Sequence, residues 1–109
     1  RLVVLALALV PATAGIIGAA ELERMDGDAW LVNVARGPHV VTDDLVAALR
    51  AGAIGGAALD VTDPEPLPAD SPLWDAPNLL LTPHTSGASR QTTALAWTIF
   101  AENVGRFKV

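Results

Sequence analysis

The stretch AWLVNVARG, residues 29–37, is apolar over most of its length and then ends in an arginine followed by a glycine. An apolar run without alternation is typical of a strand that is covered on both faces in a parallel sheet, here expected at residues 29–34. Further runs predict strands at Leu2–Leu9, Gly56–Val61 and Leu79–Leu81. Because parallel strands need crossover connections, we expect helices between them.

The segments between these runs carry helix signals. Residues 18–25 predict a short helix. In residues 42–52, Thr42 is a good N-cap, acidic residues occupy the first turn and Gly52 is a good C-terminal stop. Over residues 89–107, apolar side chains recur at helical spacing and are expected to bury one face of a last helix. The order predicts an α/β fold, namely part of a Rossmann-type, doubly wound parallel sheet with right-handed crossovers.

Residues 62–78 lie between the third and fourth predicted strands and contain five prolines. Proline lacks a backbone N–H donor, so this segment is expected to form neither a helix nor a sheet ladder. Long irregular loops in compact domains are usually functional. We therefore expect residues of this loop to take part in the site.

The chain has seven basic and twelve acidic residues, a formal net charge of −5 and no cysteine. Because the basic residues are scattered, neither nucleic acid nor an anionic membrane is expected as a partner. Two histidines without cysteine make a poor zinc site, so no metal is expected and His39 is interpreted as a loop residue. The apolar run after Arg1 also resembles a signal peptide, but its valines and the patterns that follow favour a strand.

Three ionisable residues occur where predicted strands end. Arg36 follows the second strand, Asp60 ends the third and His84 follows the fourth. The carboxyl ends of parallel strands meet at one edge of a sheet, so these three side chains are expected to converge. A convergent charged set beside a cleft is a candidate functional site.

The motifs Leu31–Gly37, Ala57–Val61, Pro64–Leu67 and Thr82–His84 occur in an order and spacing that resemble the D-isomer-specific 2-hydroxyacid dehydrogenase family. The resemblance covers nearly the whole chain. Residues 67–74 further resemble the glyoxylate and hydroxypyruvate reductase-like branch, and a phosphoglycerate dehydrogenase-like branch is the alternative. The resemblance implies a cytoplasmic enzyme that reduces a small 2-oxoacid to a D-2-hydroxyacid with NAD, or NADP, as its cofactor.

The resemblance also implies catalytic roles for three residues. Arg36 would bind the substrate carboxylate, because a guanidinium is a planar fork of donors that is always charged. His84 would be the acid and base, since histidine titrates near neutral pH. Glu65, between two prolines, would hold His84 by a hydrogen bond and favour its charged form.

By the same resemblance, one set of residues would face the cofactor, with Asp60 on the side of the nicotinamide ring. This sequence departs from the family at Leu7 and Ala8, where the family commonly has a polar residue and then proline, so we expect only a weak or backbone contact there. The expected cofactor contacts are Leu7, Val34, Ala35, Arg36, Asp60, His84 and Gly87.

The sequence contains no Gly-x-Gly-x-x-Gly loop to hold a diphosphate. In the family, that loop precedes the part that this chain resembles, and a substrate domain is built from both chain ends. We therefore expect residues 1–109 to be the C-terminal part of an NAD-binding domain, inactive alone and homodimeric in the full-length protein. Without its usual neighbour, the first strand is expected to expose an edge.

Two alternatives remain open. The chain could be an NAD(H)-sensing binding module of the corepressor type, which uses the same fold to report cofactor level. It could also be a remnant with a vestigial site. The complete set of Arg36, Glu65 and His84 favours the enzyme.

Overall fold

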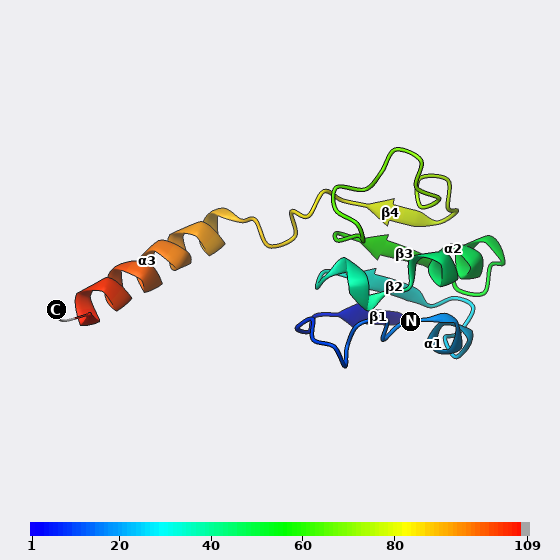
Figure 1. Ribbon diagram of the computed structural model, residues 1–109, viewed down its shortest axis with the longest axis horizontal. Helices are drawn as coiled ribbons and strands as arrows, with labels where there is room; N and C mark the ends of the chain where they lie inside the picture. Colours follow the sequence, from blue (N-terminus) through cyan, green and yellow to red (C-terminus); the bar gives the residue numbers. More distant parts are fainter. Residues whose placement is uncertain (108–109) are drawn as a thin grey trace.

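A computed structural model describes residues 1–107 of the chain (Figure 1). Four parallel strands form one sheet in the order β1-β2-β3-β4, so strands that are consecutive in the chain are neighbours in the sheet. The predicted α/β fold with a parallel, Rossmann-type sheet is confirmed. The strands are β1 (Leu2–Leu5), β2 (Trp30–Asn33), β3 (Gly56–Leu59) and β4 (Leu79–Leu81).

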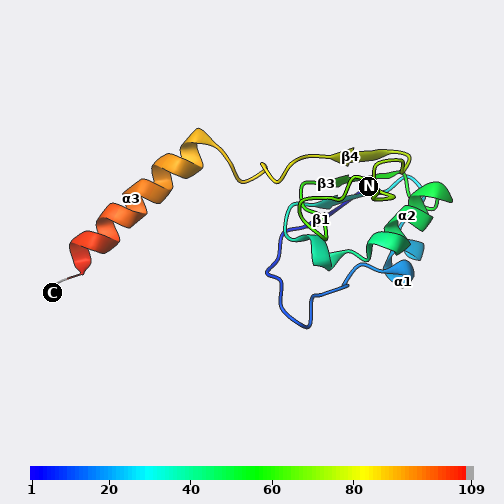
Figure 2. The same cartoon turned by 45° about the horizontal axis from the view of Figure 1, so that its top comes forward.

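Two helices, α1 (Ala19–Glu23) and α2 (Thr42–Arg50), pack against each other on one face of the sheet (Figure 2). A short 3-10 helix, η1 (Gly37–His39), follows β2. Thr42 was expected to cap α2 but is its first helical residue. The cap is Val41, whose backbone is extended and whose N–H donates to Ile17 O over 2.9 Å.

The register of the sheet explains which side chains are buried. In the row of Val3, Leu31, Ala57 and Leu79, the two central residues are completely buried against the helices. The adjacent row of Val4, Val32, Ala58 and Leu80 points to the opposite face, where Val4 is 50% and Leu80 57% exposed. Coverage of both faces was expected, but α1 and α2 lie on the same side.

β1 is shorter than the predicted strand 2–9 and lies at the edge of the sheet. Three of its four residues are exposed and only Leu5 is buried. The prediction of an exposed edge at this strand is therefore confirmed. The chain leaves the ladder after Leu5 and forms a turn in which the Thr13 hydroxyl accepts from Val10 N and donates to Ala8 O, each over 2.9 Å.

The last helix, α3 (Arg90–Arg106), begins after the N-cap Ser89, whose hydroxyl accepts from Thr92 N over 2.9 Å. The prediction that α3 buries one face is wrong for the part of the chain that the structure describes. The helix extends away from the sheet (Figures 1 and 2), and none of its residues is buried. Within residues 1–107, no helix has the length and apolar character needed to cross a membrane.

Residues 62–78 form an irregular loop between β3 and β4, as predicted. The loop is anchored by Leu73, which is 2% exposed and belongs to the core. The Trp74 indole N–H donates to Pro68 O over 2.7 Å. Leu73 therefore ties the loop to the core, and the bond from Trp74 to Pro68 closes a turn within the loop.

Candidate active site

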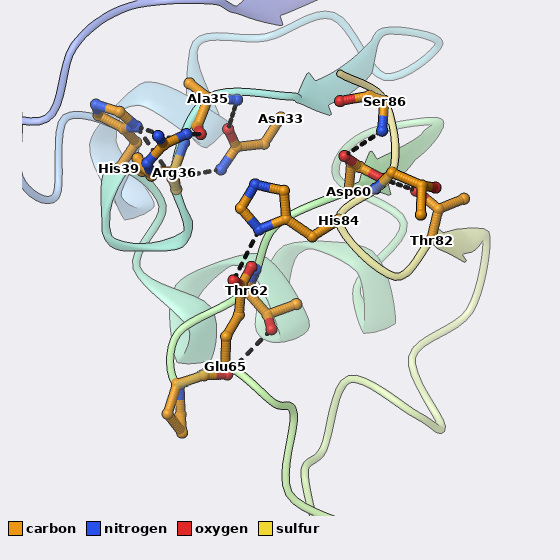
Figure 3. A network of polar contacts seen from close by, with 12 residues as sticks. Asn33, Ala35, Arg36, His39, Asp60, Thr62, Glu65, Thr82, His84 and Ser86 are labelled. Carbon is orange, nitrogen blue, oxygen red and sulfur yellow. Dashed lines mark hydrogen bonds and ion pairs between the residues drawn. The ribbon is translucent and has the colours of Figure 1, made fainter. Parts of the chain in front are cut away.

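Glu65 and His84 form an ion pair at the carboxyl edge of the sheet (Figure 3). His84 Nδ1 lies 2.9 Å from Glu65 Oε2, and Thr62 N donates to Glu65 Oε1 over 2.9 Å. Because a carboxylate can only accept, His84 Nδ1 carries a proton and Nε2 is left as the nitrogen directed away from Glu65. The His84 side chain is 49% exposed, so this nitrogen can meet a substrate.

The hydrogen bond from His84, followed by that from the Thr62 N–H, lowers the pKa of Glu65 below its ordinary value. The positive charges of His84 and Arg36 add smaller effects in the same direction, and together they outweigh the opposing effect of partial burial. Glu65 is therefore a carboxylate at neutral pH. It is charged and hydrogen-bonded on both oxygens, which suits a residue that orients an imidazole.

Asp60, directly after β3, is only 5% exposed and holds the loop that carries His84 by hydrogen bonds. Its Oδ1 accepts from Thr85 N over 2.9 Å and from the Thr82 hydroxyl, and its Oδ2 accepts from Ser86 N over 2.8 Å. Hydrogen bonds from Ser86 and Thr82 lower the pKa of Asp60 well below its usual range. The expected contact of Asp60 with the nicotinamide stays a prediction.

The backbone of His84 is held in the same way. Its φ of +52° lies in the left-handed region, which is uncommon for residues other than glycine. The His84 N–H donates to the backbone oxygen of Asp60 over 2.9 Å. The hydrogen bonds to Asp60 thus fix the left-handed backbone of His84 and the two residues after it. The fixed backbone directs the imidazole of His84 towards Glu65.

Arg36 follows β2 at the same edge, but its guanidinium does not contact His84 or Glu65. Its Nη1 donates to Ala35 O over 2.6 Å. The segments that carry Arg36 and Glu65 touch nevertheless, because a Cβ on Gly37 would lie 1.9 Å from Thr62 O. The structure therefore brings Glu65 and His84 into contact and places Arg36 beside them.

Two buried side chains that were not predicted as site residues hold the backbone of Arg36. Asn33 Nδ2 donates to Arg36 O over 2.9 Å, and Arg36 N donates to His39 Nδ1 over 3.2 Å (Figure 3). His39 was interpreted as a loop residue, but it lies in η1 and is fully buried. A polar residue in an otherwise apolar strand was the available signal for Asn33, because such a side chain needs buried partners.

A pocket of about 590 Å³ lies beside the ion pair of Glu65 and His84. Glu65 and His84 line it together with the apolar side chains of Leu67, Trp74 and Leu81. Its size falls in the range of small-molecule sites, and the combination of apolar walls with a few polar groups is typical of them. The proline-rich loop thus supplies one wall of the pocket as well as Glu65.

The residues expected at the cofactor lie along the same edge. Leu7 is half-buried after β1, and Val34 is 38% exposed after β2, next to the buried Ala35. Gly87 stands in open space, since an added Cβ would meet nothing within 4 Å. Apolar surface and accessible backbone suit a flat aromatic amide, so these residues fit the reacting end of a nicotinamide. Residues 1–107 contain no glycine-rich turn that fits its diphosphate.

A parallel sheet with a histidine–glutamate ion pair and a pocket at its carboxyl edge is typical of part of a Rossmann-type cofactor domain. The sequence model of "D-isomer specific 2-hydroxyacid dehydrogenase, NAD binding domain" matches residues 1–86. The chain therefore belongs to this family, as its motifs predicted. The prediction of NAD, or NADP, as the cofactor is confirmed at the level of the family.

Individual relatives agree with this assignment. An uncharacterized protein of Corynebacterium melassecola is 50% identical over 105 residues, which are 96% of this chain and 34% of that protein. A D-isomer specific 2-hydroxyacid dehydrogenase of Xanthobacter autotrophicus, solved with NADPH and MES, is 44% identical with a TM-score of 0.82 over 96% of this chain and 33% of its own.

Phosphoglycerate dehydrogenase of Lactobacillus plantarum is 40% identical with a TM-score of 0.78, over 97% of this chain and 34% of its own. The chain thus spans about a third of the length of each of these three relatives. What the whole relatives do is therefore considered for this chain only as a proposal.

Proposed function

We propose that this chain is the C-terminal part of the NAD-binding domain of an oxidoreductase that reduces a small 2-oxoacid to a D-2-hydroxyacid. The observation that carries the proposal is the pair of Glu65 and His84, 2.9 Å apart beside a pocket at the edge where a Rossmann-type sheet binds its cofactor. The Xanthobacter relative, solved with NADPH, supports NADP as an alternative to NAD.

In this reaction His84 is the acid that protonates the substrate. Glu65 keeps the proton on Nδ1, so Nε2 of the imidazolium donates the other proton to the carbonyl oxygen as the oxygen gains negative charge. The reduced nicotinamide, when bound, supplies the hydride to the carbonyl carbon. Glu65 stabilises the imidazolium before transfer, and in the reverse direction His84 takes the hydroxyl proton.

Arg36 binds the substrate carboxylate in this proposal. To do so, its guanidinium exchanges the bond to Ala35 O for two bonds to the carboxylate. The exchange is favourable because a charged, bidentate pair is stronger than a hydrogen bond to a neutral carbonyl. The exchange needs only a change in the exposed side chain, since buried contacts fix the backbone of Arg36.

We also propose that the chain alone is inactive and that the complete enzyme works in the cytoplasm as a homodimer. Binding energy for a dinucleotide comes largely from its diphosphate, for which residues 1–107 offer no fitting loop. The uncovered apolar sheet face with Val4 and Leu80 supports pairing with further protein surface. Sedimentation of the full-length protein measures its oligomeric state.

The decisive experiment compares NADH oxidation by two proteins in the presence of glyoxylate, hydroxypyruvate or pyruvate. One is the 109-residue chain, and the other is the Xanthobacter enzyme in which residues 1–86 of this chain replace the matching segment. We expect turnover from the chimera only. His84→Phe should lower its kcat by at least about 100-fold while the affinity for NADH stays the same. A chimera that binds NADH but whose turnover does not depend on His84 would contradict the proposal and favour a cofactor-sensing module.

A further inference from the structure

His39 is a buried histidine that the proposed reaction does not use. It is fully buried, whereas His84 is exposed, and both of its ring nitrogens have partners. Nδ1 lies 3.2 Å from Arg36 N, and Nε2 lies 3.3 Å from Ala8 O. Ala8 and Arg36 belong to the segments that follow β1 and β2, so one ring connects two neighbouring strand ends.

The Nε2–H tautomer gives each ring nitrogen a complementary backbone partner. A backbone N–H can only donate, so Nδ1 must accept from Arg36 N. A backbone carbonyl can only accept, so Nε2 must carry the proton that it donates to Ala8 O. The Nε2–H tautomer therefore satisfies both of these contacts. Nδ1 also lies 3.0 Å from Arg36 O, to which it can donate only if it is protonated, and in a ring protonated at Nδ1 alone Nε2 would face Ala8 O without a proton.

The contacts of His39 and Asn33 fix the backbone of Arg36 and do not involve its side chain. His39 binds the N–H of Arg36, Asn33 binds its carbonyl, and both side chains are fully buried. The Arg36 side chain remains exposed at the sheet edge. A long side chain anchored at a fixed Cα reaches only a limited region, so the position of this backbone decides where the guanidinium can meet a carboxylate.

The other end of the ring holds the segment that leads from β1 into the turn. Ala8 O accepts from His39 Nε2 and also from the Thr13 hydroxyl over 2.9 Å. Ala8 directly follows Leu7, one of the residues expected at the cofactor. His39 is therefore the connection between the segment that would face the cofactor and the residue that would bind the substrate.

We propose that His39 is a positioning residue whose ring fixes Arg36 through Nδ1 and the Ala8 segment through Nε2, and so sets the distance between the substrate carboxylate and the cofactor. This inference rests on the proposed function only where it gives Arg36 a substrate. The hydrogen bonds themselves can be tested without turnover.

Asparagine and glutamine separate the two contacts. In His39→Asn, the amide oxygen replaces Nδ1 and nothing reaches Ala8. In His39→Gln, the longer amide reaches Ala8 O and the acceptor for Arg36 N is lost. Val46→Ala is the control, because Val46 is buried in α2 away from these contacts and its loss lowers stability alone.

NMR of the 109-residue chain reports each contact. We expect ring nitrogen shifts of the Nε2–H tautomer in the wild type. Relative to the Val46 control, the Arg36 amide should exchange about fivefold faster in His39→Gln and at an unchanged rate in His39→Asn. The carbonyl carbon shift of Ala8 should change only in His39→Asn. Equal Arg36 exchange in both variants, or a wild-type ring protonated at Nδ1, would overturn the proposal.

Kinetics of the active chimera test the consequence. His39→Gln should raise the KM for glyoxylate about fivefold, and His39→Asn should instead raise the KM for NADH. A merely structural role predicts that both constants change together, in the order of thermal stability. A chimera without turnover would contradict the proposed function. The hydrogen exchange rates of the Arg36 amide would still decide whether His39 positions Arg36.

Discussion

Gly37→Ala tests the contact that joins the two halves of the site. A Cβ at this position would lie 1.9 Å from Thr62 O and 2.6 Å from Asp63 N, whereas real Cβ atoms are essentially never closer than 3.0 Å to such neighbours. The obstacle is backbone on both sides, so the two segments must separate by about 1 Å or more. Glu65 accepts from Thr62 N and would move with it.

The cost of this overpacking is about 3 kcal/mol, near the upper end for insertion into a packed site. For a domain of this size it corresponds to a fall in Tm of about 10–20 °C. Urea unfolding of the chain, followed by circular dichroism, measures the loss. Gly27→Ala is the matched control, since a Cβ there would meet nothing within 4 Å. If both variants unfold at the same urea concentration with the same slope, the close approach is wrong.

Three further results are expected. Because the folded-state pKa of Glu65 is lowered, its contribution to stability should be complete above the unfolded value near 4.5 and should disappear as the pH falls through the folded value. A carbon-detected titration of Glu65 should therefore have its midpoint below 4.5, and Glu65→Gln should flatten the acid limb of the stability curve; a midpoint above 4.5 contradicts the ion pair. Leu31→Ala, at a completely buried position, should lower the free energy of unfolding by about 3 kcal/mol. Leu80→Ala, at a position 57% exposed, should lower it by less than about 1 kcal/mol. Similar losses for the two variants in urea unfolding would mean that both faces of the sheet are covered. Gly52→Ala should destabilise the chain by about 1 kcal/mol in urea unfolding, because Gly52 follows the end of α2 with a φ of +64°, which disfavours a side chain. An unchanged midpoint would show that the turn after α2 rearranges.

The apolar runs predicted where the strands lie better than they predicted their burial. All four strands occur within the expected segments, because a continuous apolar run is a local property of the chain. The apolar runs also predicted that both faces of the sheet are covered, yet Val4 and Leu80 are exposed. Burial depends on which helices cross which face, and no single segment carries that information. The same reason applies to α3, whose apolar spacing was visible but whose partner surface was not.

The site was predictable only in part for a similar reason. The positions of Arg36 and His84 after strands indicated that they share an edge, since strand polarity fixes that edge. No feature of the sequence indicates that Asp60 holds the His84 loop through the backbone N–H groups of Thr85 and Ser86. Backbone donors look alike in every sequence, so contacts made through them become visible only when the chain is folded.

Local polarity and backbone preferences were enough to predict the order of strands and helices, the proline-rich loop and the ionisable residues at strand ends. Three contacts emerge only in the folded chain: Glu65 lies 2.9 Å from His84, the guanidinium of Arg36 turns back to Ala35 O, and His39 connects two strand ends. These are contacts whose geometry depends on how the sheet and its loops pack, and packing is a property of the whole fold.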